Sequence, residues 1–217
     1  MNKDFTLVKP KVSQTLKHSF DKNIINDEEV MIEDVFLENI TFENVNNRKI
    51  EFNSCVFKDV KFVNSVLLQT SLIDIIFNHC DLSNLDLSGS TIYCTEFHNC
   101  KLVGVDLSTS IMQNVLIDNC NCRYINLSGC KIKKMEIGNS DLTDGSIIES
   151  LLNEVKFDSL NLQNVELLST PLMNINLSSC NINGIRISGS ELKGSIVSRE
   201  QAITLVQLLG LNIDEEV

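Results

Sequence analysis

Three histidines and a scattering of carboxylates are the residues of this chain that could transfer protons in a reaction. The histidines are His18, His79 and His98, and none has a nucleophile beside it at a consistent spacing. The sequence also lacks a glycine-rich phosphate loop and a Ser-His-Asp set. General acid–base chemistry needs a dry, concave site, and nothing in the residue pattern builds one. We therefore expect a protein that is not an enzyme and has no catalytic residue.

Eight cysteines are the second set of residues with possible chemistry. Cys80, Cys100 and Cys120 are evenly spaced along the chain, so a ladder of metal-binding thiolates is conceivable. A soft-metal site needs a converging tetrahedral set, however, and there is no Cys-x-x-Cys pair. The pattern favours small reduced thiols in a narrow core, with no metal and no cofactor. Only Cys94 is predicted to face outward. The other seven fall on inward positions of a repeat: Cys55, Cys80, Cys100, Cys120, Cys122, Cys130 and Cys180.

A five-residue repeat sets the positions of all these residues. From Cys80 the chain reads Cys-Asp-Leu-Ser-Asn and then Leu-Asp-Leu-Ser-Gly. The centre of each five is large and apolar, and the residue two before it is small or apolar. Stepping in fives from Ile32 to Val197 meets an apolar centre every time except at Asn47. A period of five fits neither a helix nor a simple strand, so the pattern predicts a repeat architecture.

The sequence also repeats over a longer period, which is made of four fives. The lines that start at His79, Asn99 and Asn119 resemble one another. Four fives per period give four short sides per turn, which predicts a square coil. Coils bonded like parallel strands lie about 4.8 Å apart, so roughly eight and a half coils make a rod about 40 Å long. One column of corner positions holds residues that tolerate left-handed dihedrals: Asn44, Asn64, Asn84, Gly104, Asp144, Asn164 and Gly184.

The segment before the repeat is expected to cover the first coil, because an open coil end is an exposed sheet edge. Residues 1–29 are predicted to form this N-terminal arm or cap, and residues 30–197 the repeat domain. Pro10 opposes a helix at the start of the arm, while residues 24–29 are expected to join the sheet. Asn47 is the one polar centre, so we expect either a distorted wall or a local Asx turn there.

Residues 198–217 are predicted to form a C-terminal helix and tail that cap the coil and mediate dimerisation. Ser198 and Gln201 have capping-box spacing, and a helix is expected to run to about Leu209, with Gly210 as its C-terminal glycine. The apolar arc of this helix is wider than capping the last coil requires, which predicts a homodimer interface. The residues assigned to that interface are Ile203, Val206, Leu208, Leu209 and Leu211.

The (Ala/Cys/Ser)-(Asp/Asn)-(Leu/Phe)-x-x pattern resembles that of the pentapeptide-repeat family over about four-fifths of the chain. This resemblance implies an all-β fold, a right-handed quadrilateral parallel β-helix, here with a short C-terminal α-helix. The end from Ser198 to Leu211 resembles the C-terminal module of the Qnr-like quinolone-resistance subgroup. The match is to its loopless, Gram-positive type, and it implies homodimerisation through the C-terminal end.

Net charge restricts the partners of the rod. At −11, the chain is not expected to bind nucleic acid directly or to bind an anionic membrane surface. The sequence has no apolar run long enough to span a bilayer and no hydrophobic signal region, so we expect a soluble cytoplasmic protein without a small-molecule substrate. Half of the acidic excess falls on one side of the coil, called here the acidic side. Its carboxylates are Glu38, Asp59, Glu96, Asp118, Glu136 and Asp158.

The Qnr-like resemblance implies a partner for the acidic side: a type II topoisomerase, DNA gyrase or topoisomerase IV. A rod that imitates duplex DNA would bind this enzyme and lessen its poisoning by quinolones. Duplex DNA carries a charge about every 1.7 Å, whereas this side offers about one per coil, so mimicry would depend on shape and partial charge. Three alternatives stay open: a solvated face that maintains solubility, a scaffold for another protein partner, and a structural rod that assembles end to end.

Overall fold

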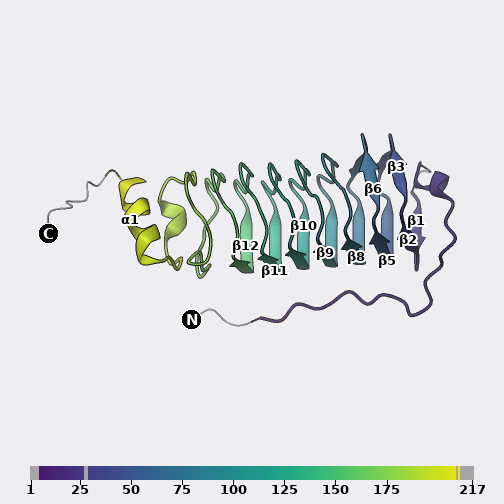
Figure 1. Cartoon of the computed structure of the whole chain (residues 1–217), viewed down its shortest axis with the longest axis horizontal. Coiled ribbons are helices and arrows are strands. Elements are labelled where there is room, and N and C mark those ends of the chain that lie inside the picture. The colour runs from purple at the N-terminus through teal and green to yellow at the C-terminus, as the bar shows by residue number, and fades with distance from the viewer. Residues whose placement is uncertain (1–4, 27–28, 209, 211–217) are drawn as a thin grey trace.

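Coils stacked along one axis make up most of the protein, and short strands form part of their walls (Figure 1). The computed structural model describes residues 5–26, 29–208 and 210. The strands build a parallel solenoid, and one short helix stands at its C-terminal end. The strands are β1 Met31–Glu33, β2 Phe36–Glu38, β3 Thr41–Glu43, β4 Asn46–Arg48, β5 Glu51–Lys58, β6 Lys61–Val63, β7 Val66–Leu68, β8 Ser71–Asn78, β9 Thr91–His98, β10 Ile111–Asp118, β11 Lys131–Gly138 and β12 Leu151–Asp158.

Each strand pairs in parallel with a strand that is one turn, or four fives, away along the chain. Met31 lies beside Glu51 at the start of the main ladder, and Ile111 beside Lys131 further along it. The ladder has the order β1-β5-β8-β9-β10-β11-β12, with β2 also paired to β5, which gives about six turns of paired strand. Isolated bridges with the same offset continue as far as Asn176 and Ile196. The predicted all-β parallel solenoid is confirmed.

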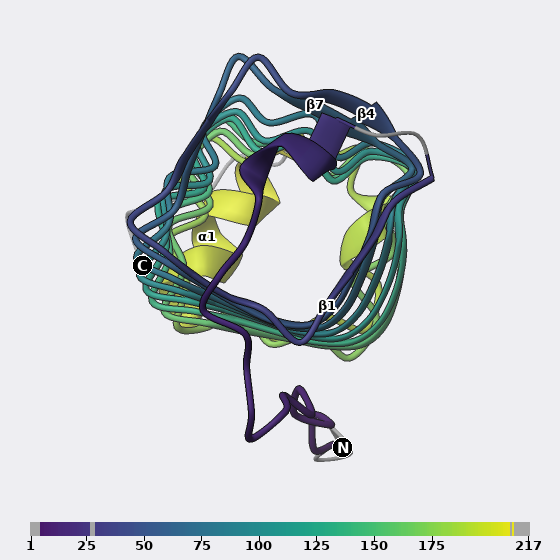
Figure 2. The ribbon, with the colours of Figure 1, turned by 90° about the vertical axis from the view of Figure 1, so that its right-hand side faces the viewer.

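A residue with left-handed backbone angles turns the chain at every fifth position along most of the solenoid. The predicted corner residues have this conformation, for example Asn64 at φ 48° and Gly104 at φ 66°. Tyr124 in the same column, at φ 60°, and Cys94 in another column, at φ 47°, also have this conformation, although these residue types seldom adopt it. Bonds between coils hold such residues there, since the N–H of Tyr124 donates to the carbonyl of Thr143 at 3.0 Å. Repeated corners give the coil its angular outline (Figure 2).

The centre of each five and the residue two before it point into the solenoid and form one continuous core. Phe57, Phe77 and Phe97 stack in one column, with ring centroids 4.6 Å and 4.9 Å apart, as their spacing of one coil predicts. From Ile32 to Ile182, the side chain at the centre of each five points into the solenoid. Burial of large apolar side chains along this whole axis is the main stabilising contribution, and it leaves only the outer walls to contact other molecules.

The inward phase changes near the C-terminal end of the solenoid. There η2 (Ser190–Leu192) buries Glu191 at 4% exposure, while Leu192, the expected inward residue, is only partly buried. The Glu191 carboxylate accepts hydrogen bonds from the N–H groups of Ser169 and Ser188, at 2.9 Å and 3.0 Å. Burial alone would raise the pKa of Glu191, but these bonds and the Ser188 hydroxyl lower it below its ordinary value. The prediction of an unbroken phase to Val197 therefore holds only in part.

A 3₁₀ helix, η1 (Lys22–Asn26), closes the N-terminal end of the solenoid. Ile25 is buried, and its carbonyl accepts a hydrogen bond of 2.6 Å from Nδ2 of Asn47. Asn47 lies in β4 with regular pairing, so it marks neither the distorted wall nor the local turn that we predicted. The prediction that residues 24–29 join the sheet was wrong for 24–26, which belong to η1. The first coil is instead bridged by Lys17, which lies beside Val35.

The helix α1 (Arg199–Leu208) covers the opposite end. The predicted capping box is confirmed, because the N–H of Gln201 donates to Oγ of Ser198 at 3.1 Å and the N–H of Ser198 donates to Oε1 of Gln201 at 2.8 Å. Nε2 of Gln201 also donates to the carbonyls of Leu177 and Cys180 at 2.7 Å and 2.8 Å. These carbonyls lie at the end of the coil stack, so the helix satisfies acceptors that a further coil would otherwise take.

Candidate partner-binding surface

The six carboxylates of the acidic side lie on one wall of the solenoid, in three neighbouring columns. The strand pairing places those that share a column two or more coils apart. The first column holds Glu96 and Glu136, the second holds Glu38, Asp118 and Asp158, and the corner beside them holds Asp59. The predicted side is therefore a real wall of the molecule, but its charges do not form a single line.

Within each column the carboxylates alternate with residues of other kinds. Leu116 lies between Glu96 and Glu136, and Lys156 follows Glu136 on the next coil. The two glutamates are thus two coils apart, or about 10 Å at the usual strand spacing. Duplex DNA carries about one charge every 1.7 Å. The acidic side is therefore much less densely charged than the surface of DNA.

Neighbouring side chains neutralise or engage part of this charge. Glu38 accepts a hydrogen bond of 2.7 Å from Nζ of Lys58, one coil away, and this bond raises the pKa of Lys58. Glu96 lies 2.9 Å from Nε2 of His98, and Asp118 accepts a bond from Asn139 at 3.1 Å. In the part of the chain that the structure describes, Asp59, Asp118, Glu136 and Asp158 form no salt bridge. Asp158 also accepts a hydrogen bond of 3.0 Å from Oγ of Ser159, so Asp59 and Glu136 are the carboxylates most available to a cationic partner.

The other walls carry ion pairs between neighbouring coils. A count of the charges on each side of the coil does not reveal these pairs. Asp81 lies between Lys61 and Lys101, with N–O distances of 3.8 Å and 3.9 Å. Burial alone would raise the pKa of Asp81, but hydrogen bonds from Ser83 and these two lysines lower it. The sequence contains a signal for such pairs, namely opposite charges one coil apart in the same column.

An extended N-terminal arm, residues 5–17, runs beside the solenoid along much of its length (Figure 1). It follows one corner, called here the arm corner. The N–H of Val8 donates to Asn114 at 3.3 Å, and that of Lys11 to Asp74 at 2.9 Å. This course was not predicted, and no signal in the repeat indicates which corner the arm follows, because the repeat describes only coil-to-coil contacts. The arm corner comprises Asp34, Ser54, Asp74, Cys94 and Asn114.

Burial of Cys94 follows from the position of the arm. This thiol is 1% exposed but is not part of the core cluster, so Cys94 points away from the core as predicted, while the arm shields it from solvent. It lies between Asp74 and Asn114 on the arm corner, where both neighbours bind the arm. Burial raises the pKa of Cys94, which favours the protonated, less reactive thiol.

The remaining cysteines occupy the core positions that the repeat predicts. All eight are buried and free, and burial raises the pKa of Cys130 to about 11. In the described residues, no group of three His, Cys, Asp or Glu side chains could hold a metal ion. The ladder of Cys80, Cys100 and Cys120 is therefore a stack of core thiols in this structure.

The predicted dimer interface falls only partly within the described residues. On α1, Ile203 is 54% exposed and Val206 is half-buried, whereas Leu205 packs into the core. The side chain of Leu208, and all of Leu209 and Leu211, lie outside the described residues. The helix thus combines a covered face with at least one exposed apolar residue, and dimerisation through it stays a prediction.

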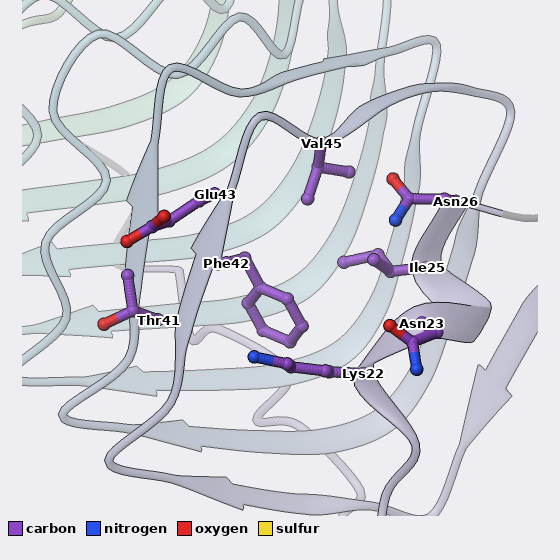
Figure 3. Close-up of a pocket in the computed structure, with 8 residues that line it drawn as sticks. All are labelled: Lys22, Asn23, Ile25, Asn26, Thr41, Phe42, Glu43 and Val45. Atoms are coloured by element: carbon purple, nitrogen blue, oxygen red, sulfur yellow. The ribbon is translucent and has the colours of Figure 1, made fainter.

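A pocket of about 370 Å³ lies at the N-terminal end, between η1 and β3 (Figure 3). Its lining includes Lys22 and Ile25 from η1 and Phe42 and Glu43 from β3, and Lys22 extends toward Phe42. The lining residues also include Thr41, Asn23 and Asn26, and none of them is a histidine, cysteine or serine. Separately, no helix in the described part of the chain is long and apolar enough to cross a membrane.

Comparison with known proteins identifies the repeat. A family model described as the Pentapeptide repeat region matches residues 71–146, within the stretch where coils pair without interruption. This stretch is therefore similar to the pentapeptide repeat region, as its sequence pattern indicated. No curated protein matches it.

Several solved structures are similar to this chain. A trypsin-treated variant of QnrB1, a plasmid-mediated fluoroquinolone resistance protein, is 18% identical and covers 85% of this chain and 100% of its own, with a TM-score of 0.48. A second trypsin-treated QnrB1 variant is 21% identical, covers 86% and 92%, and has a TM-score of 0.43. HetL, a pentapeptide-repeat protein involved in heterocyst differentiation regulation from the cyanobacterium Nostoc sp. strain PCC 7120, is 14% identical and covers 79% and 91%, with a TM-score of 0.39. These identities are too low to transfer a function.

Proposed function

We propose that this protein is a non-enzymatic DNA-mimic rod that binds a type II topoisomerase, DNA gyrase or topoisomerase IV, and protects it from quinolone poisoning. The observation that carries the proposal is a straight solenoid with one wall on which six carboxylates gather (Figure 1). Such a wall presents negative charge along a rod, which complements a basic, DNA-shaped groove. The resemblance of the sequence to the Qnr-like group supports the choice of partner.

The spacing of the charges determines how such a complex would behave. Asp59, Asp118, Glu136 and Asp158 provide the salt-bridge-free charge, and the four lie on different coils. Electrostatic attraction at this density is moderate and strongly screened by salt. Because no insertion interrupts the constant offset between coils, contact would be made by the walls and not by a projecting loop. We therefore expect weak, salt-sensitive binding.

The proposal includes the assembly and location of the rod. We infer a right-handed solenoid of about eight and a half coils, a homodimer formed through the C-terminal end, and a cytoplasmic protein. Ile203, exposed on α1, supports the dimer because an uncovered apolar residue beside a chain end favours self-association. A dimer of this kind would place two rods end to end and lengthen the DNA-like surface.

A supercoiling assay with purified gyrase, with and without a fluoroquinolone, tests the function. We expect the protein at micromolar concentration to alter supercoiling or to restore activity in the presence of the drug. The variant Glu136→Lys/Asp158→Lys should lose the effect, whereas Glu43→Lys/Glu149→Lys, with the same change in net charge on other walls, should retain it. No effect of the unmodified protein on gyrase or topoisomerase IV would refute the proposal.

A second candidate function is a protein–protein interaction scaffold with a different partner. The low charge density of the acidic side favours this alternative, because a partner that does not bind DNA has no need of a phosphate-like spacing. The Glu136→Lys/Asp158→Lys variant separates the two candidates when used in affinity capture. A partner that depends on these carboxylates but is not a topoisomerase would support the scaffold.

A further inference from the structure

The N-terminal arm is held to the arm corner by its backbone. The N–H groups of Val8, Lys11 and Ser13 donate to Asn114, Asp74 and Ser54, at 3.3 Å, 2.9 Å and 2.9 Å. All three acceptors are side-chain oxygens, and the strand pairing places them on one column of the solenoid. Since the arm contributes main-chain donors at these points, the bonds specify an extended peptide and only weakly specify its sequence.

The arm is attached much less firmly than any coil. Within the described part of the arm, Lys17 alone forms a bridge to the solenoid backbone, beside Val35, whereas each coil bonds to its neighbours on all sides. Phe5, Leu7 and Val12 are half-buried, and the arm residues Lys9 and Lys11 are exposed. A segment with few buried apolar contacts and few backbone bonds belongs to the part of a protein that opens at low free-energy cost.

The surface beneath the arm has the features of a built binding site. Asn114 is a polar side chain only 3% exposed, and its Oδ1 accepts the N–H of Val8. Cys94, directly between Asp74 and Asn114 on the column, is 1% exposed. If the arm leaves this corner, the acceptors lose their N–H donors, and water or another peptide can take the place of those donors.

Charge indicates which peptides fit. Asp34 and Asp74 lie on the arm corner, and the acidic side begins on the next strand segment. The arm itself carries Lys9, Lys11 and Lys17. A segment with lysines between its backbone donors therefore complements the corner electrostatically, as the resident arm does.

We propose that the arm corner is a peptide-binding site that the N-terminal arm occupies reversibly, and that an extended, lysine-containing segment of a partner chain binds in its place. The arm then acts as an intramolecular competitor that lowers the apparent affinity for such a segment. This site is separate from the acidic side, so it can exist whether or not the protein binds a topoisomerase.

The test keeps the full chain and removes the donors of the arm. In Lys11→Pro/Ser13→Pro, the two N–H groups that bind Asp74 and Ser54 are lost. Alkylation of Cys94 by a maleimide, followed by mass spectrometry, should accelerate by about tenfold or more as two hydrogen bonds disappear. The other seven buried thiols serve as the internal reference. The matched control Thr6→Pro/Gln14→Pro changes arm residues other than the three whose N–H groups bind the corner side chains, and it should leave the rate unchanged.

A labelled peptide with the sequence of residues 5–17 then probes the vacated corner. It should bind the Lys11→Pro/Ser13→Pro protein with saturation, return Cys94 to its slow rate, and bind the unmodified protein much more weakly. The same peptide with prolines at the positions of Lys11 and Ser13 should not bind. If the proline variant does not fold, the alkylation rate of Cys94 is measured in Asp74→Ala, which removes an acceptor on the solenoid in place of the donors on the arm. Unchanged Cys94 reactivity in both variants, or a peptide that gives no protection, would overturn the proposal.

Discussion

Asn47 and Ile25 join the N-terminal cap to the first coil. Nδ2 of Asn47, in β4, donates a hydrogen bond of 2.6 Å to the carbonyl of Ile25, in η1. Both residues are buried, at 5% and 1% exposure. A polar residue at an otherwise apolar centre thus satisfies the backbone of the segment that closes the open end of the solenoid.

Replacing Asn47 with leucine should loosen this cap. Asn47→Leu fits the apolar core but leaves the Ile25 carbonyl without this donor, and a buried acceptor that loses its partner costs about 1–3 kcal/mol. Urea denaturation should show that loss, and hydrogen exchange at residues 22–26 should accelerate. Asn46→Leu, at the exposed neighbouring position of β4, is the matched control and should change stability much less. Equal stability of Asn47→Leu and the unmodified protein would contradict the role of the bond.

Removing one ring from the phenylalanine column should destabilise several coils at once. Phe97 is 2% exposed and stacks on Phe77 at 4.9 Å with an interplanar angle of 6°. Phe97→Ala leaves a cavity against its neighbours and should cost about 3–5 kcal/mol in unfolding free energy. Tyr93→Ala, on the same strand but 39% exposed, should cost less. The two can be compared by thermal and urea unfolding, and a Phe97→Ala loss no larger than that of Tyr93→Ala would contradict the packed column.

Glu191 should contribute a pH dependence to stability. Its pKa in the folded protein lies below the ordinary value of 4.5, so the folded state favours the ionised carboxylate. The stabilisation is therefore fully present above the unfolded-state pKa and is lost as the pH falls through the folded-state pKa. The melting temperature of Glu191→Gln should be lower than that of the unmodified protein at neutral pH. The two should converge on acidification below about pH 4. A difference that is constant across this range would show that titration of Glu191 is not the cause.

The C-terminal cap should depend on Gln201 more than on its neighbours. Gln201→Ala removes the donor to the Leu177 and Cys180 carbonyls and half of the capping box with Ser198. Loss of such a cap costs about 1 kcal/mol, and the two unpaired carbonyls add to it. Glu200→Ala, at an exposed position of α1, is the control. Circular dichroism and hydrogen exchange over residues 199–208 measure the effect, and intact helix protection in Gln201→Ala would contradict it.

The repeat itself could be predicted because local and long-range signals coincide in it. The apolar centres, the small residues two before them and the corner asparagines all recur with every five, so the inward set, the Phe57–Phe77–Phe97 column and the corner dihedrals follow from the sequence. The capping box at Ser198 was equally local. Each of these features depends on residues whose relative positions the period already fixes.

The remaining features depend on contacts outside the period. The arm bonds to Asn114 across 106 residues, and no pattern in residues 5–17 indicates that partner, so the burial of Cys94 could not be foreseen. Asn47 is conspicuous in the sequence, but its partner Ile25 belongs to the off-period segment. On the acidic side, the period placed the six carboxylates on one wall, while their bonds to Lys58, His98 and Asn139 depend on rotamers that sequence does not determine.

The constant offset between paired residues has a consequence for how such a chain can change in length. Adding or deleting one residue would move every later corner off its column, and with it every later apolar centre. A whole coil, by contrast, can be gained or lost with all corners still aligned. A single five also keeps the apolar centres inward but moves every later residue to the next wall, so only steps of four fives, one coil, keep each later residue in its own column as well.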